Sequence, residues 1–336
     1  MKWTIVPMIV FAIVMSAAAR DGDSAYRQAR RDGALAKFQI HVVDDSGQGV
    51  SNAEIRVFLG MNFEPKGRWL DGVSDSDGFF DIEGVTCGDE VIINVEKTGW
   101  YPSRKKLCYA TMGAEHKVKE GKWQPFGSCE EVRLRPIKNP ARNSLSGKFV
   151  YTRRLDQWLG FDLEANDFVS PEGVGKISDF ELRINWTGRW DSVCQGIGVD
   201  VRFADAMSGY CLTPVCQTSS FKGPYCADIN GGFSQSASFY EGIEGVQALT
   251  GGIWRTDSCW VVRSRCKVSP DGKLLKANYS AVYNIEFVGK RDGRGGVRIY
   301  RVFNPTPNDT NLEPMSYEAK KWLRTKKINE QKEAQK

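Results

Sequence analysis

The stretch FQIHVVDDSGQGVSNAEIRVFL, residues 38–59, contains two alternating segments on either side of a turn-forming sequence. Apolar side chains stand at every second position from Phe38 to Val42 and again from Ile55 to Leu59. This is the period of a strand that buries one face. The first segment stops at residues 44–47, DDSG, whose side chains favour turns. The stretch therefore predicts two β-strands joined by a polar turn.

The same pattern continues beyond this stretch. Val73 leads into Asp77-Gly78, where both residues tolerate positive φ, so a hairpin is expected that returns through the strand that follows. Short strands punctuated by turn residues, with no helical pattern between them, indicate a β-sandwich. The further strands are expected at residues 79–82, 90–97 and 132–137.

Three stretches of this region resemble a known family. They are VDDSGQGVSNA at residues 43–53, SDSDGFF at 74–80 and KTGWY at 97–101. They resemble the carboxypeptidase-regulatory-like, or prealbumin-like, domains. The resemblance covers residues 36–137 and implies a non-catalytic, seven-stranded sandwich attached to another part of the protein. The segment from Cys108 to Cys129 looks like an insertion before the last strand of that domain.

The second half of the chain is also predicted to be β. Residues 138–150 read as a linker, because proline and asparagine interrupt the strand pattern there. In residues 151–315 apolar side chains alternate from Phe180 to Trp186, and turns are marked by paired glycines. The fold class is therefore all-β: a prealbumin-like β-sandwich followed by a second β-sandwich-like domain. Residues 316–336, which are rich in basic side chains, are expected to form a short charged helix or tail.

Two further stretches resemble the C-terminal part of exported bacterial proteins that also begin with a prealbumin-like domain. They are LGFDLEANDFVSP at residues 159–171 and FNPTPNDTNLE at residues 303–313. This resemblance implies an architecture only, and it supplies no catalytic residues.

Residues 1–19 have the composition of a cleavable signal peptide. Lys2 precedes an apolar run from Ile5 to Met15, and Ala17–Ala19 provides the small residues of a cleavage site before Arg20. The run is too short to span a bilayer. We expect export to the periplasm, the cell surface or the medium, no transmembrane segment in the mature chain, and a charged arm or short helix at residues 20–35.

The net charge of +5 is unevenly distributed. Residues 317–336 hold seven basic and three acidic side chains, so the body of the exported chain is close to neutral. A nucleic-acid-binding domain carries a basic face on its folded part. The sequence therefore argues against a nucleic-acid partner.

The nine cysteines favour disulfides, because exported chains meet an oxidising compartment. No Cys-x2-Cys spacing occurs, which argues against a zinc site. Cys108 and Cys129 would clamp the inserted segment and are expected to pair. Cys259 and Cys266 lie too far apart along one predicted strand to pair with each other. The full set of candidates is Cys108, Cys129, Cys194, Cys211, Cys216, Cys226, Cys259 and Cys266.

No catalytic residue, metal site or cofactor is assigned from the sequence. The two histidines, His41 and His116, read as ordinary strand and loop residues. The densest acidic group of the second domain leaves three interpretations open: the acid and nucleophile of a glycosidase, metal ligands, or solvated loop acids. This group consists of Asp162, Glu164, Asp167 and Asp179.

Trp158 and Trp190 are the candidate binding residues, because each follows a polar or turn-forming segment and indoles stack on sugar rings and flat surfaces. The sequence thus predicts an exported non-catalytic envelope or secreted protein that binds a glycan or another envelope protein. A secreted hydrolase acting on glycans with the acidic group, and a structural spacer, are the alternatives.

Overall fold

A computed structural model describes residues 24–60, 67–109, 117–141, 145–187, 194–244, 250–252, 257–289 and 293–333 of the chain. The chain divides into two compact units. Unit 1 is Met1–Pro136 together with Thr218–Ser220, and unit 2 is Ile137–Gln217 together with Phe221–Lys336. The division falls next to the boundary that the linker composition predicts.

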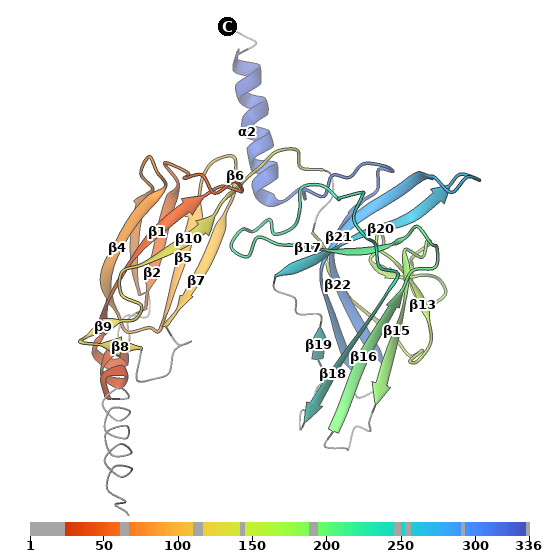
Figure 1. Ribbon diagram of the computed structural model, residues 1–336, viewed down its shortest axis with the longest axis horizontal. Helices are drawn as coiled ribbons and strands as arrows, with labels where there is room; N and C mark the ends of the chain where they lie inside the picture. Colours follow the sequence, from red (N-terminus) through yellow and green to blue (C-terminus); the bar gives the residue numbers. More distant parts are fainter. Residues whose placement is uncertain are drawn as a thin grey trace, which may run out of the picture. The chain divides into compact units, whose positions relative to one another are not determined.

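Unit 1 is a sandwich of two main β-sheets (Figure 1). In the first sheet β1 pairs with β4, β9 and β10, and β8 pairs with β9. These strands are β1 (Ala34–Val43), β4 (Phe79–Thr86), β8 (Val118–Lys119), β9 (Lys122–Trp123) and β10 (Ser128–Arg133). The second sheet has the order β3-β2-β5-β7. Its strands are β2 (Glu54–Leu59), β3 (Arg68–Val73), β5 (Glu90–Glu96) and β7 (Ser103–Cys108). A small sheet pairs β6 (Trp100–Tyr101) with β11 (Arg135–Pro136).

The core of unit 1 lies between the two sheets, as the alternation predicts. Phe38, Ile40 and Val42 of β1 and Ile55 and Val57 of β2 belong to one buried cluster. Of the two expectations for residues 20–35, a charged arm or a short helix, the structure shows a helix over residues 24–32. Its Ala29 is buried in the same cluster, so the helix is part of the folded unit.

The turn at residues 75–78 is not a hairpin, which corrects the expectation from Asp77-Gly78. The strand before it, β3, pairs with β2, whereas the strand after it, β4, pairs with β1 in the other sheet. The turn therefore crosses from one sheet to the other. Gly78 has φ 86°, and a Cβ there would lie 2.4 Å from the carbonyl oxygen of Val42. Close backbone packing explains the glycine, in addition to its φ.

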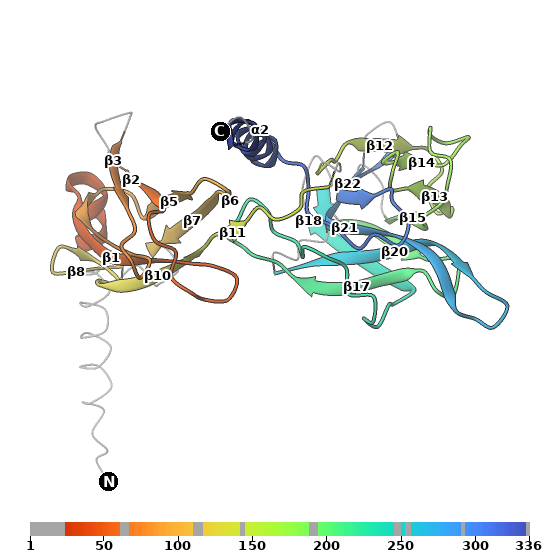
Figure 2. The same ribbon diagram turned by 90° about the horizontal axis from the view of Figure 1, so that it is seen from above.

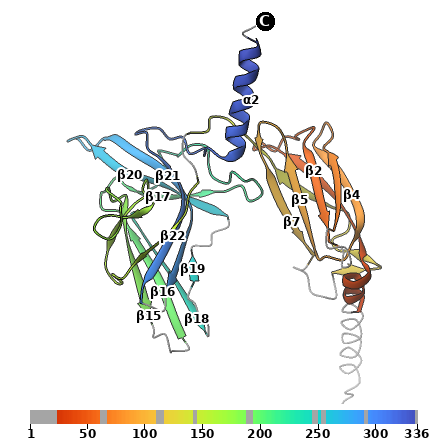
Figure 3. The ribbon, with the colours of Figure 1, turned by 180° about the vertical axis from the view of Figure 1, so that it is seen from behind.

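Unit 2 is also a β-sandwich, and this confirms the all-β prediction. One sheet has the order β12-β22-β21-β20-β17, with β19 paired to β21, and the other has the order β14-β13-β15-β16-β18. Figure 3 shows β15, β16 and β18 side by side. The strands are β12 (Phe149–Thr152), β13 (Leu159–Asp162), β14 (Asp167–Phe168), β15 (Phe180–Thr187), β16 (Cys194–Arg202), β17 (Gly209–Pro214), β18 (Ser236–Glu244), β19 (Thr250–Gly252), β20 (Ser258–Val268), β21 (Leu274–Gly289) and β22 (Gly295–Asn304).

Two apolar layers stabilise this sandwich. The larger lies between the sheets and includes Phe161 and Phe180 from one sheet and Phe287 from the other. The smaller includes Val261 of β20 and Leu312. Adjacent positions in a regular strand face opposite sides, and β20 follows this rule, because Trp260 joins the larger layer and Val261 the smaller.

The first and last segments of unit 2 are joined through Glu313. Its buried carboxylate accepts hydrogen bonds from the backbone amides of Lys138 at 2.9 Å and Asn139 at 2.6 Å. The expected linker at residues 138–150 is therefore partly fixed to the body of unit 2. After Glu313, α2 (Tyr317–Glu333) extends away from the two sheets of this unit (Figures 1 and 2).

Candidate functional site

Three of the four acidic residues converge on one arginine. The guanidinium of Arg265 donates from Nε to Oδ1 of Asp179 at 2.9 Å, from Nη2 to Oδ1 of Asp162 at 2.9 Å and from Nη1 to Oε2 of Glu164 at 2.6 Å. The side chains of Asp179, Asp162 and Arg265 keep 0%, 6% and 13% of their accessible surface, whereas Glu164 keeps 55%. We call these four residues the Arg265 hub.

Backbone irregularity in β20 turns Arg265 toward the hub. The pairing of β20 with β21 shifts between Ser264 and Lys267, and Arg265 itself has φ 55°. Left-handed backbone is uncommon for a residue other than glycine. Asp162 ends β13 and Asp179 immediately precedes β15. Arg265, at the irregular position of β20, therefore binds Asp162 at the end of β13 and Asp179 just before β15, both in the other sheet.

Backbone amides donate hydrogen bonds to both carboxylate oxygens of Asp162. Its Oδ1 accepts a hydrogen bond from the amide of Ala165 at 3.0 Å, and its Oδ2 accepts from those of Lys176 at 2.8 Å and Ile177 at 3.2 Å. Burial alone would raise the pKa of Asp162, but these amides and Arg265 outweigh it and hold the pKa below its usual value. Asp162 is thus a buried anion that fixes the loop between β14 and β15.

Asp179 is held equally tightly. Besides Arg265, its carboxylate accepts hydrogen bonds from Oγ of Ser264 at 2.6 Å and from the amide of Leu163 at 2.7 Å. Burial is the largest influence on the pKa of Asp179 and raises it, against the opposing effect of Arg265, Ser264 and Leu163. A carboxylate without accessible surface, with these partners, has no direction from which a substrate could approach.

A second arginine supports the loop of the hub. Arg301 donates from Nε to the carbonyl oxygen of Leu163 at 2.5 Å and from Nη2 to that of Glu164 at 2.9 Å. Burial lowers the pKa of Arg301. Two arginines from different strands therefore fix one acidic loop, and this is the arrangement of a structural clamp.

Asp167, the fourth acidic residue, lies outside the hub. It forms an ion pair with Lys148 at 2.9 Å, and its Oδ1 accepts the amide of Phe168 at 2.8 Å. Neither contact leads to Arg265. In the described part of the chain, no group of three or more histidine, cysteine, aspartate or glutamate side chains is placed to hold a metal ion.

Trp158 lies on the outward face of the sheet that contains β15 and β16. A turn brings it there, with the amide of Asp156 donating to the carbonyl oxygen of Ile184 at 2.9 Å. The guanidinium carbons of Arg202 and Arg183 lie 4.1 Å and 5.0 Å from the centroid of the indole. Trp158 is half-buried, and cation–π contacts hold its ring, which was expected in a polar loop.

Polar side chains surround Trp158 on this outward face. Asp200 accepts hydrogen bonds from Nη2 of Arg183 at 2.8 Å and from Nδ2 of Asn185 at 2.5 Å. Burial would raise the pKa of Asp200, but hydrogen bonds from Ser238, Arg183 and Asn185 hold it below its usual value. Arg202 binds Glu181 at 2.5 Å. We call the following set the Trp158 face: Trp158, Glu181, Arg183, Asn185, Asp200 and Arg202.

Trp190, the other candidate indole, lies outside the described residues. His116 also lies outside them, whereas His41 stacks on Phe79 with ring centroids 4.1 Å apart. Such a contact suits a strand residue of the sandwich. The partners of Trp158 could not be found in the sequence, because they depend on the pairing of β15 with β16.

The expected pair of Cys108 and Cys129 is not formed. Cys129, in β10, carries a free thiol, and Cys108 ends β7 in the other sheet of unit 1. Cys266 is also free, so it is not bonded to Cys259, in agreement with the single strand β20. The side chain of Cys194 lies outside the description. Cys87, Cys211 and Cys226 also carry free thiols.

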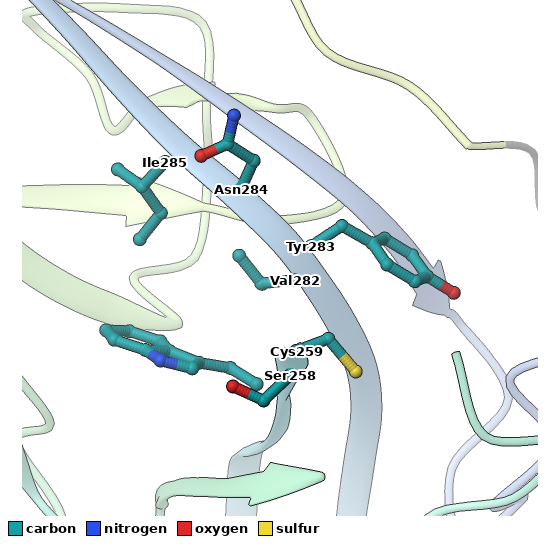
Figure 4. Close-up of a pocket in the computed structure, with 7 residues that line it drawn as sticks. Ser258, Cys259, Val282, Tyr283, Asn284 and Ile285 are labelled. Atoms are coloured by element: carbon teal, nitrogen blue, oxygen red, sulfur yellow. The ribbon is translucent and has the colours of Figure 1, made fainter. Parts of the chain in front are cut away.

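A small hollow beside β21 is too narrow for a ligand. It is lined by residues of β20 and β21, among them Cys259, Trp260 and Asn284, and holds about one water molecule. Figure 4 shows Tyr283 and Ile285 on opposite sides of β21. They diverge because the pairing of β21 with β22 shifts between Val282 and Asn284.

Comparison with known proteins gives no family. No family model matches the chain, and no curated protein matches it. A 3-chlorocatechol 1,2-dioxygenase from Rhodococcus opacus 1CP aligns at 10% identity over 31% of this chain and 61% of its own, with a TM-score of 0.25. A catechol 1,2-dioxygenase from Acinetobacter sp. ADP1 aligns at 9% identity over 31% and 53%, with a TM-score of 0.23. The chain thus covers less than two thirds of these proteins, and so slight a likeness says nothing of its activity.

Proposed function

We propose that the chain is an exported, non-catalytic protein of the cell envelope or the secreted fraction, and that the Trp158 face binds a glycan. The observation that carries the proposal is the indole of Trp158, held on Arg183 and Arg202 beside the carboxylate of Asp200. Export rests on the composition of residues 1–19. The two-sheet sandwich of unit 1 supports an accessory role for that unit, in keeping with its resemblance to prealbumin-like domains.

The chemistry of this face suits a sugar. An indole that is already fixed loses little conformational entropy when the apolar side of a pyranose ring stacks on it. Asn185 and Asp200 offer planar amide and carboxylate groups for neighbouring hydroxyl groups. Arg183 and Arg202 are each neutralised by a carboxylate, Asp200 and Glu181 respectively. The balanced charge favours a neutral glycan over an acidic one.

The hydrolase alternative gains no support from the acidic group. A glycosidase needs two carboxyl groups that reach the scissile bond from either side. Asp162 and Asp179 are instead bound to Arg265 and to backbone amides. Glu164 is the exposed member of the hub, and it too binds Arg265. These contacts favour a structural role for the group.

The test compares two tryptophans of similar setting. Trp69 of unit 1 is 43% exposed and lies 5.0 Å from the guanidinium of Arg56. The full chain is first screened on a glycan array, and the affinity of Trp158→Ala and Trp69→Ala is then measured by calorimetry. We expect Trp158→Ala to weaken binding at least tenfold, corresponding to about 1.4 kcal/mol, and Trp69→Ala to leave it unchanged.

Either of two results would refute the proposal. The first is a parent chain that binds no glycan. The second is a loss of binding in Trp69→Ala with none in Trp158→Ala, which would transfer recognition to unit 1. Thermal unfolding of both variants shows whether a loss of affinity follows from a loss of folding.

A further inference from the structure

The basic side chains of α2 are concentrated on one side of the helix. Successive residues are about 100° apart around an α-helix. Lys320, Arg324 and Lys327 therefore share one narrow strip, and Lys321 and Lys332 lie beside it. The five together occupy about 140° of the circumference. We call them the basic stripe.

The acidic residues of α2 lie on the other side. At the same angular spacing, Glu318 and Glu330 fall outside the arc of the basic stripe, together with Lys326. Among the helix residues whose side chains the structure describes, none within the arc is acidic. The charge of α2 is thus separated by face, although its apolar residues are not.

The basic stripe faces solvent. All five of its side chains are exposed, whereas Ala319 on the other side is fully buried. Basic residues three and four positions apart repel each other and weaken a helix, as do Lys320 with Arg324 and Arg324 with Lys327. An anionic partner would offset this repulsion, so binding one would be favourable for the helix.

Two large apolar side chains lie within the same arc. Tyr317 is 77% exposed and Ile328 is 51% exposed, and both project from the side that carries the basic stripe. A soluble polyanion or a nucleic acid would satisfy the charges but would give Ile328 no apolar surroundings. A bilayer with anionic headgroups offers both, since basic residues bind its phosphates and apolar side chains enter between its lipids.

We propose that the basic stripe of α2 binds the surface of an anionic phospholipid bilayer. The helix lies on the surface in this arrangement: none of the helices in the described part of the chain has the length and apolar character that crossing a bilayer requires. The site is separate from the Trp158 face, so either assignment can fail without the other.

The test is co-sedimentation of the full chain with two kinds of vesicle. One is pure phosphatidylcholine, and the other contains about 30% phosphatidylglycerol, enough anionic lipid to attract basic side chains. We expect binding to the anionic vesicles only, and a steep decrease between low and high salt, because the attraction is screened. Absence of binding to anionic vesicles, or equal binding to both kinds, would overturn the proposal.

Three variants locate the contact. Arg324→Glu in the basic stripe and Lys326→Glu on the other side change the charge equally, and we expect at least a tenfold loss of vesicle binding for the first and less than a twofold loss for the second. Ile328→Ser should weaken vesicle binding but leave binding to heparin unchanged. Equal effects of Arg324→Glu and Lys326→Glu would refute the stripe. Heparin binding as tight as vesicle binding, with no effect of Ile328→Ser on vesicles, would identify a general polyanion site instead.

Discussion

Arg265 and Asp179 form a bidentate ion pair inside unit 2, with Nε to Oδ1 at 2.9 Å and Nη2 to Oδ2 at 3.1 Å. Asp179 has no accessible side-chain surface. The desolvation cost of such a buried pair is offset only while both charges are present. Removing either partner would leave the other charge buried without a counter-ion, so both are needed for the stability of unit 2.

Replacing this arginine should destabilise unit 2 strongly. Arg265→Met leaves Asp162 and Asp179 buried without their cation, and we expect it to lower the free energy of unfolding by about 3–5 kcal/mol. Arg202→Met is the matched control, because Arg202 is 48% exposed, and its contacts with Glu181 and with the ring of Trp158 are each worth about 1 kcal/mol or less. Denaturant unfolding measures both. Similar values for the two variants would show that the hub is not structural and would reopen its acids to a catalytic role.

The hub should also make the stability of unit 2 depend on acid. The pKa of Asp162 is lower in the folded chain than its unfolded value of about 3.9. Its contribution is therefore fully present above about pH 4 and decreases as the pH falls toward the lower, folded pKa. Burial raises the pKa of Asp179, so that residue acts in the opposite direction.

Comparison with Asp162→Asn isolates the first effect. The variant cannot lose a charge on acidification, so the difference in unfolding free energy between parent and variant should be largest at neutral pH and should shrink below about pH 4. Denaturant titrations at several pH values provide the measurement. A difference that grows on acidification would mean that the pKa of Asp162 is raised by the fold.

Two glycines with similar backbone angles should respond differently to alanine. Gly47 has φ 83° and Gly78 has φ 86°, but a Cβ on Gly47 meets nothing within 4 Å, whereas one on Gly78 meets the carbonyl oxygen of Val42 at 2.4 Å. Gly47→Ala should cost about 1–2 kcal/mol from backbone strain alone. Gly78→Ala should cost about 2–5 kcal/mol, because overpacking is added. Equal melting temperatures of the two variants would contradict the packing of the turn against β1.

The thiols should differ in their rates of alkylation. Cys129 and Cys226 are exposed, whereas burial raises the pKa of Cys211 and Cys266 and so lowers the fraction of reactive thiolate. In native protein at neutral pH we expect maleimide to label the first two rapidly and the last two only after denaturation. Mass spectrometry of the peptides gives the order. A disulfide found at Cys129 or Cys226 would contradict the free, exposed thiols that the structure places at these positions.

The strands could be predicted where a single face is buried. The alternation from Phe38 to Val42 places those side chains in the core without any knowledge of the partner strand. The connection through Gly78 could not be predicted in this way. The local signal for positive φ is the same in a hairpin and in a crossing between sheets, and the distinction lies in the pairing of β3 and β4 with other strands.

The candidate residues show the same limit. The acidic group could be selected from composition, but its role depends on Arg265, which is 86 positions from Asp179. That contact needs the irregular pairing of β20, for which residues 260–268 carry no glycine, asparagine or aspartate as a signal. Trp158 could be selected as an indole in a polar segment, yet the arginines that hold it come from β15 and β16.

The hydrogen bonds of Glu313 to Lys138 and Asn139 have a mechanical consequence. A pulling force that enters unit 2 at its first residues and leaves through α2 meets these bonds before it reaches either sheet. Asn311 adds a parallel link, because its Nδ2 donates to the carbonyl oxygen of Asn139 at 2.7 Å. Tension along the chain therefore bypasses the sandwich until these links break, and the surface around Trp158 keeps its shape under load.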